Sequence, residues 1–146
     1  MHPPVATLGA AVLTKETTML AGVQIPNRAE VDSFVTLDGS TIRELAGPAW
    51  TQARHQSLAE ATIGAGGETL EHHHHVSEEI YYFVRGRGRM RLGPDERDVV
   101  AGDCVVIPPG TPHKLWAAAD EELVLLCACA PAYSDADTEI TERSGA

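Results

Sequence analysis

Short apolar segments separated by glycine- and proline-rich turns run along the chain from residue 34 to residue 131. None of them repeats its apolar residues with the period of a helix over a convincing length. Runs of branched and aromatic residues between Gly and Pro are typical of strands. The pattern therefore predicts an all-β fold, a barrel or a sandwich. The expected strands are 34–37, 41–45, 56–63, 79–84, 98–101, 104–107 and 123–129.

The chain of 146 residues has the length of one domain with one hydrophobic core. We expect an N-terminal arm with short strands or a hairpin at 1–47, a barrel at 48–131 and a polar C-terminal extension at 132–146. Within the arm, Asp38-Gly39 lies between two apolar runs and is a strong signal for a two-residue hairpin turn. The extension is acidic and is expected to lie on the surface.

The charge and hydropathy of the chain exclude several classes of partner. A net charge of −10 argues against nucleic acid and anionic membranes, because both need a basic protein face. No stretch reaches the roughly 18 apolar residues of a membrane span. The mildly apolar stretch 5–13 has no basic residue immediately before it, so a signal peptide is not expected. We expect a small-molecule partner and a cytoplasmic location.

Four consecutive histidines begin at His72, between apolar segments rather than at a terminus, so they are native sequence and not an expression tag. Successive side chains of a strand alternate faces, so His72 and His74 point the same way. After a tight turn, Glu79 begins the next strand and can face the same pocket, and His113 follows a proline-rich turn far downstream. Imidazoles and a carboxylate form a shell that suits one divalent transition metal, Fe, Mn, Ni, Co, Cu or Zn.

This segment resembles the first metal motif of the cupin superfamily, Gly-x5-His-x-His-x3or4-Glu-x6-Gly, and matches it in two registers. One register comprises Gly66, His72, His74, Glu79 and Gly86; the other comprises Gly67, His73, His75, Glu79 and Gly86. Single-domain cupins that continue with Glu-Ile-Tyr-Tyr commonly have the four-residue gap before the glutamate. The resemblance therefore favours the first register, with the other two histidines facing outward.

A second segment is similar to the second cupin motif, Gly-x5-Pro-x-Gly-x2-His-x3-Asn. It matches at Gly102, Pro108, Gly110 and His113, with Ala117 where Asn is usual. That Asn is not a ligand in the family, so the departure leaves the ligand set complete. The resemblance implies a double-stranded β-helix, a jelly-roll barrel with the metal inside one mouth. The implied metal ligands are His72, His74, Glu79 and His113.

The resemblance also implies a metal-dependent enzyme that acts on a small oxygenated molecule such as a diketone, keto acid or sugar derivative. Single-domain cupins include dioxygenases, isomerases, decarboxylases and lyases, and the central region resembles cupins named mannose-6-phosphate-isomerase-like. The alternatives are a non-catalytic module that binds a sugar or metabolite and a metal-stabilised structural protein. Related jelly rolls commonly pair through edge strands, so a homodimer is expected.

Three groups of residues have two interpretations each. Tyr81 shares a face with Glu79 and either orients a substrate or belongs to an aromatic core. The sequence has three cysteines, Cys104, Cys127 and Cys129. Their odd number and the lack of a Cys-x-x-Cys pair argue against a disulfide framework. Cys127 and Cys129 share one face of a strand, as small core residues or as thiols near the metal. The arginines between 85 and 91 line one strand face, either solvated or anion-binding.

Overall fold

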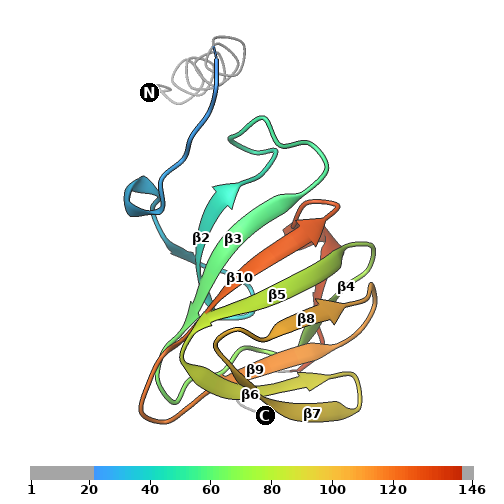
Figure 1. Ribbon diagram of the computed structural model, residues 1–146. Helices are drawn as coiled ribbons and strands as arrows, with labels where there is room; N and C mark the ends of the chain where they lie inside the picture. Colours follow the sequence, from blue (N-terminus) through green and yellow to red (C-terminus); the bar gives the residue numbers. More distant parts are fainter. Residues whose placement is uncertain (1–21, 143–146) are drawn as a thin grey trace, which may run out of the picture.

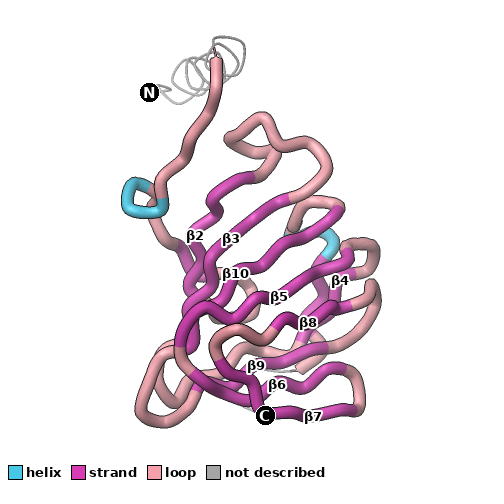
Figure 2. Tube along the Cα trace, viewed as in Figure 1, coloured by secondary structure: helices cyan, strands magenta, loops and turns pink. Residues whose placement is uncertain are grey.

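The computed structural model describes residues 22–142, so residues 1–21 of the expected arm and residues 143–146 lie outside the described part. Within it, the strands form two antiparallel sheets that enclose a common interior (Figures 1 and 2). Between residues 22 and 142, helix is limited to two short 3-10 segments, η1 (Arg28–Glu30) and η2 (Asp135–Asp137). No helix in residues 22–142 has the length and hydrophobicity of a membrane span.

The larger sheet has the strand order β1-β2-β3-β10-β5-β8, and the smaller has the order β11-β4-β9-β6-β7. Neighbouring strands are often far apart in sequence, as in a jelly roll, and the predicted all-β jelly-roll barrel is confirmed. The larger sheet comprises β1 (Phe34–Val35), β2 (Thr41–Ala46), β3 (Ser57–Ile63), β5 (Glu78–Arg85), β8 (Cys104–Ile107) and β10 (Leu123–Ala130). The smaller sheet comprises β4 (His72–His74), β6 (Arg87–Leu92), β7 (Asp95–Val100), β9 (His113–Ala117) and β11 (Thr138–Ile140).

Alternation along the strands sends one face of each sheet into a shared core. In β5, Glu79, Tyr81 and Phe83 are buried, whereas the residues between them are exposed. This period of two places the Glu79 carboxylate in the same interior as the apolar core. Burial of each large apolar side chain contributes roughly 1.5–3 kcal/mol to folding. The most completely buried large side chains are Phe83, Ile107, Leu115, Leu123, Leu125 and His113.

The expected hairpin is present as β1 and β2, but its loop is longer than the predicted two-residue turn. The paired residues leave 36–40 as the loop, which is closed by a hydrogen bond from Thr36 N to Ser40 O. Oδ1 of Asp38 accepts hydrogen bonds from Ser40 N, Ser40 Oγ and Thr36 Oγ1. The prediction was wrong because these side-chain hydrogen bonds stabilise a wider loop.

The C-terminal segment, expected as a polar surface extension, adds a strand to the smaller sheet. β11 pairs with β4, and Glu139 lies opposite His73 in the register. Beyond β11, the Glu142 carboxylate contacts the buried Lys114 ammonium and accepts a hydrogen bond from Glu71 N. The acidic composition of this segment therefore reflects polar partners on the barrel as well as exposure to water.

The outer face of β5 carries a row of partly exposed apolar side chains. Ile80 is 37% exposed, and Tyr82 and Val84 are each 47% exposed. Such a row is compatible with a protein contact, but apolar residues also occur singly on ordinary surfaces. The homodimer stays a prediction.

Two glycines with similar backbone angles allow the effect of close packing to be measured. Gly86 has a φ of 85°, and a Cβ there would lie 2.1 Å from Glu122 O. Gly102 has a φ of 96°, and a Cβ there would have no neighbour within 4 Å. We expect Gly102→Ala to lower the free energy of unfolding by about 1–2 kcal/mol through backbone strain. Gly86→Ala should cost about 1–3 kcal/mol more because of overpacking.

Urea denaturation of the two variants measures this difference. Equal losses would contradict the close approach between the β5–β6 connection and the residues before β10.

Candidate metal centre

Three strands from the two sheets bring four ligand-type side chains together. His72 and His74 lie on the inner face of β4, His113 of β9 is directly opposite His72, and Glu79 comes from β5 in the other sheet. All four are buried, and their candidate ligand atoms lie within 4.8 Å of one another. These four residues, named the inner site below, bridge the two halves of the barrel and could hold a metal ion.

The Glu79 carboxylate lies at the centre of the inner site. Its Oε1 is 3.2 Å from His74 Nε2 and 3.3 Å from His113 Nε2. The ring centroids of His72 and His113 are 4.2 Å apart. Separations near 3 Å between ligand atoms are those of neighbouring ligands that each lie about 2.0–2.2 Å from one ion.

Backbone carbonyl groups orient two of the imidazoles. Nδ1 of His72 lies 2.9 Å from Leu70 O, and Nδ1 of His113 lies 2.9 Å from Thr111 O. A carbonyl oxygen can only accept, so Nδ1 carries the proton in both contacts. In the neutral ring the lone pair is then on Nε2, which faces the interior.

The third imidazole is oriented by a hydroxyl from the C-terminal strand. His74 Nδ1 lies 3.0 Å from Thr138 Oγ1, and that hydroxyl donates its own proton to Ser134 O at 2.9 Å. The hydroxyl oxygen therefore accepts from Nδ1 of His74. All three neutral imidazoles thus direct an Nε2 lone pair inward, the arrangement that metal-binding histidines use.

This tautomer pattern makes the inner site require a cation. With their Nδ1 protons turned outward, neutral His74 and His113 present lone pairs to the ionised oxygen of Glu79, and such atoms repel one another. Nε2 of His113 is buried and has no hydrogen-bond partner among the described residues. A buried group left unsatisfied in this way costs about 1–3 kcal/mol. A proton on the ring or a metal ion between the three atoms removes the conflict.

The charge states of two groups of the site suit a divalent metal ion. Burial lowers the pKa of His72, and the nearby His113 lowers it further. Burial raises the pKa of the Glu79 carboxyl, but hydrogen-bond donation and positive charge from His113 and His74 lower it by more, so the net pKa lies well below the usual range. A metal ion between these atoms would supply the same positive charge while the rings stay neutral. The site therefore combines a neutral imidazole with an ionised carboxylate, the forms that bind divalent transition metals.

Cys129 lies beside the inner site as a hydrogen-bond donor. It is opposite Glu79 in the β10–β5 pairing, and its Sγ lies 2.9 Å from Glu79 Oε2. Burial raises the pKa of this thiol, and the Glu79 carboxylate raises it further. A protonated thiol donates to the carboxylate, so Cys129 positions Glu79 rather than supplying a thiolate. The described cysteines are all free.

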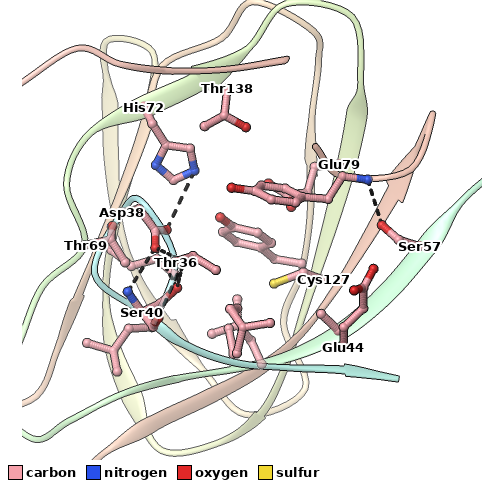
Figure 3. A pocket seen from close by; sticks show the side chains of 18 of the residues that line it. Thr36, Asp38, Ser40, Glu44, Ser57, Thr69, His72, Glu79, Cys127 and Thr138 are labelled. Atoms are coloured by element: carbon pink, nitrogen blue, oxygen red, sulfur yellow. Dashed lines mark hydrogen bonds and ion pairs between the residues drawn. The ribbon is translucent and has the colours of Figure 1, made fainter. Parts of the chain in front are cut away.

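A pocket opens beside the inner site between the β1–β2 hairpin and the core. His72 points across it toward the Asp38 carboxylate, with His72 Nε2 3.8 Å from Asp38 Oδ2 (Figure 3). Thr36 and Ser40 lie on the same loop as Asp38, and Thr138 and Cys127 also line the pocket (Figure 3). Its apolar walls include Ile42, Ala59, Ala61, Ile63, Leu115 and Leu125.

The sequence identifies Asp38 only as a turn residue and does not identify its place in the site. The sequence separation between the hairpin and the histidines matches no metal-ligand motif. The two segments come together only when the barrel closes. One signal was present, since Thr36, Asp38 and Ser40 recur at every second position and are polar. Thr138 had no comparable signal for its contact with His74, whereas a place near the metal was one of the two interpretations given to Cys129.

Tyr81 occupies a position compatible with both interpretations given to it. It is 4% exposed and belongs to the apolar core, with its ring 6.3 Å from that of Phe83. It also lines the pocket, and its ring lies edge-on to His113 with centroids 5.8 Å apart. Burial raises its pKa well above the ordinary value, so the phenol stays neutral. Its role in orienting a substrate stays a prediction.

The other two histidines of the run and the arginine row lie on the outer faces of the barrel. His73 and His75 lie on the opposite face of β4 from the inner site, beside Glu139 of β11. The arginines of β5 and β6 are exposed, except that Arg91 is half-buried, and each contacts at least one carboxylate, which agrees with a solvated face. These pairs are Arg85–Glu122, Arg87–Asp120, Arg87–Glu121, Arg89–Glu96, Arg89–Asp98, Arg91–Glu71 and Arg91–Glu96.

Comparison with known proteins shows which proteins this chain is similar to. The family model described as "Cupin domain" matches residues 59–129. The uncharacterized protein MJ1618 of Methanocaldococcus jannaschii is 46% identical over 113 residues, which cover 77% of this chain and 90% of that protein.

Solved structures that are similar in fold include two proteins from Streptomyces. The polyketide cyclase RemF from Streptomyces resistomycificus has a TM-score of 0.72 and 19% identity, covering 85% of this chain and 89% of its own. The nucleoside dehydratase Pac13 of Streptomyces has a TM-score of 0.68 and 17% identity, covering 83% and 92%. At these identities the likeness concerns the fold.

Removal of the Thr138 hydroxyl tests whether the surroundings of His74 tune metal binding. We expect Thr138→Val to weaken the affinity of the inner site by about 10–100-fold, because His74 loses the oxygen that orients it. A chelator competition titration measures the affinity. Thr141→Val is the matched control, since Thr141 bonds Glu71 instead. Equal affinities for the two variants would show that Thr138 has no such role.

Proposed function

Because the chain belongs to the cupin superfamily, we propose that the inner site holds one divalent transition metal and that the protein is a metal-dependent enzyme. The observation that carries the proposal is the convergence of three Nε2 atoms and one ionised carboxylate beside a pocket. The proposed substrate is a small oxygenated organic molecule, such as a diketone, keto acid or sugar derivative. An ion bound there supplies a Lewis acid for a carbonyl or enolate oxygen.

The pocket lining supports a small and partly apolar substrate. Its lining combines the aliphatic walls with polar groups from the inner site and the hairpin loop, and further polar side chains are those of Glu44, Ser57, Thr69, Tyr133 and Thr138. A ligand that places an oxygen at the inner site would have its carbon skeleton against the aliphatic wall. Pockets of this kind use apolar contact for affinity and a few polar groups for orientation.

Asp38 is the group we assign to proton transfer. Three hydrogen bonds from the loop hold Oδ1, so the carboxylate has a fixed orientation. Oδ2 faces the inner site, 3.8 Å from His72 Nε2. A substrate whose oxygen lies at the inner site would have its neighbouring carbon within reach of Oδ2. Asp38 would then take a proton from that carbon at Oδ2 and return it.

Such proton transfer beside a carbonyl favours isomerase or lyase chemistry within the proposed enzyme class. The names of the similar structures, a cyclase and a dehydratase, support an enzyme on this fold but do not identify the reaction. The oxidative alternative is a dioxygenase, in which an iron ion at the inner site would bind oxygen and the reaction would consume it. The non-catalytic alternative is a module that binds a sugar or metabolite in the same pocket.

The His113→Ala variant tests the inner site itself. We expect tag-free protein, purified and then reconstituted anaerobically with Fe, Mn, Ni, Co, Cu or Zn, to bind metal at the inner site with one or more of these ions. His113→Ala should lose that ion, because it removes a ligand from the centre of the cluster. Elemental analysis after dialysis measures the content. The control is His55→Ala, which alters an exposed histidine outside the site. An unchanged metal content in His113→Ala would contradict the assignment.

The Asp38→Asn variant tests the proton-transfer role on whichever compound of a diketone, keto acid and sugar panel is turned over. Asparagine keeps an Oδ1 acceptor for the loop but removes the base, so we expect kcat to fall by about 10²–10⁴-fold with metal content unchanged. Asp32→Asn, an exposed control nearby, should leave kcat unchanged. Full kcat in Asp38→Asn would remove this role.

Oxygen uptake measured on the same panel separates the reaction classes. Uptake by the iron-loaded protein would place the activity in the dioxygenase branch. Saturable binding of a panel compound without turnover by any metal form would favour the binding module.

A further inference from the structure

A second group of metal-ligand side chains lies on the outer face of β4. His73 and His75 are edge-on to each other, with ring centroids 4.9 Å apart. Glu139 of β11 is opposite His73 in the register, and its Oε2 lies 3.5 Å from His73 Nε2 and 3.2 Å from His75 Nε2. The candidate ligand atoms of the three residues lie within 4.8 Å of one another. These three residues are named the outer site below.

The outer site has a feature that an ordinary surface contact lacks. The His73 side chain is only 17% exposed, and its Nδ1 is buried without a hydrogen-bond partner among residues 22–142. The ring is therefore held by packing rather than by water, with Nε2 directed toward Glu139. One carboxylate oxygen then faces two imidazole nitrogens at once, an arrangement that a shared cation stabilises.

We propose that the outer site is a second divalent transition-metal site, separate from the inner site, that takes Zn²⁺, Ni²⁺ or Cu²⁺ from solution. Two imidazoles and a carboxylate are ligands that these ions prefer. Three protein ligands leave positions for water, and the His75 and Glu139 side chains are 52% and 56% exposed, so the ion exchanges with solvent. The proposal does not depend on the chemistry assigned to the inner site.

The outer ion would act on the inner site through β11. This edge strand has three residues and pairs only with β4 among the described strands, and contacts of Asp137 with Val76 and of Thr141 with Glu71 hold its two ends. Adjacent residues point to opposite faces, so Glu139 reaches the outer site while Thr138 reaches His74. An ion at the outer site would bind side chains of both β11 and β4, next to the contact through which Thr138 orients His74. Occupancy of the outer site therefore stabilises the geometry of the inner site.

Zinc stoichiometry tests the proposal on tag-free protein stripped of metal with a chelator. Equilibrium dialysis should give two ions per chain for the wild type and for the control His55→Ala. His75→Ala and Glu139→Gln should each retain one ion, and both change exposed side chains. His113→Ala should also retain one ion, now at the outer site.

The outcomes separate the two sites. Two ions in His75→Ala, or a single wild-type ion that only His113→Ala removes, would overturn the outer site and leave the inner site intact. A single wild-type ion that only His75→Ala removes would support the outer site and count against the inner one.

Hydrogen exchange tests the link through β11 in His113→Ala, where zinc can occupy only the outer site. Amide exchange of residues 138–140 should slow roughly tenfold at a zinc concentration ten times the Kd, because opening the strand releases the ion. The double variant His113→Ala/His75→Ala should show no slowing. Exchange that stays unchanged while His113→Ala binds zinc would overturn the link between the sites.

Discussion

The contact of Glu79 with His74 and His113 is the interaction on which the rest of the structure depends, because it joins the two sheets at a polar point inside an apolar barrel. An ionised carboxylate in such a place costs several kcal/mol unless positive charge or donors compensate it. The Cys129 thiol provides one donor. Neutral imidazoles cannot provide others, because their Nδ1 protons are directed to Thr138 and to a backbone carbonyl. The negative charge of Glu79 is therefore only partly compensated, and a cation at the inner site would complete the compensation.

The run of four histidines follows from the geometry of one strand. β4 lies with one face toward the interior and the other toward solvent, so alternate histidines belong to two different sites. The inner pair meets Glu79 and His113, and the outer pair meets Glu139. β11 covers the strand on one side and contacts both sites with adjacent residues. A short strand with ligands on both faces makes the two sites neighbours, although their ligands point in opposite directions.

Local periodicity was sufficient to predict the inner faces, and barrel closure was not predictable from the sequence. Alternation places Glu79 with Tyr81, and His72 with His74, and the structure has both pairs buried. The motif resemblance added His113, whose position opposite His72 depends on strand pairing. Asp38 and Thr138 reach the site from the two ends of the described chain, and no local pattern indicates which strand edge each segment joins. The polar composition of the C-terminal segment predicted that the segment is exposed. The sequence did not indicate its contact with Lys114, because that side chain becomes buried only when the barrel forms.

The central claim is that three imidazoles and one carboxylate hold a cation, with the nearby thiol excluded from its coordination. X-ray absorption spectroscopy of the metal-loaded His75→Ala variant tests it most directly, because that change leaves the inner site as the occupied one. The account predicts nitrogen and oxygen neighbours at about 2.0–2.2 Å with the outer-shell scattering of imidazole rings. A sulfur neighbour at about 2.3 Å, or a metal spectrum without imidazole scattering, would contradict it.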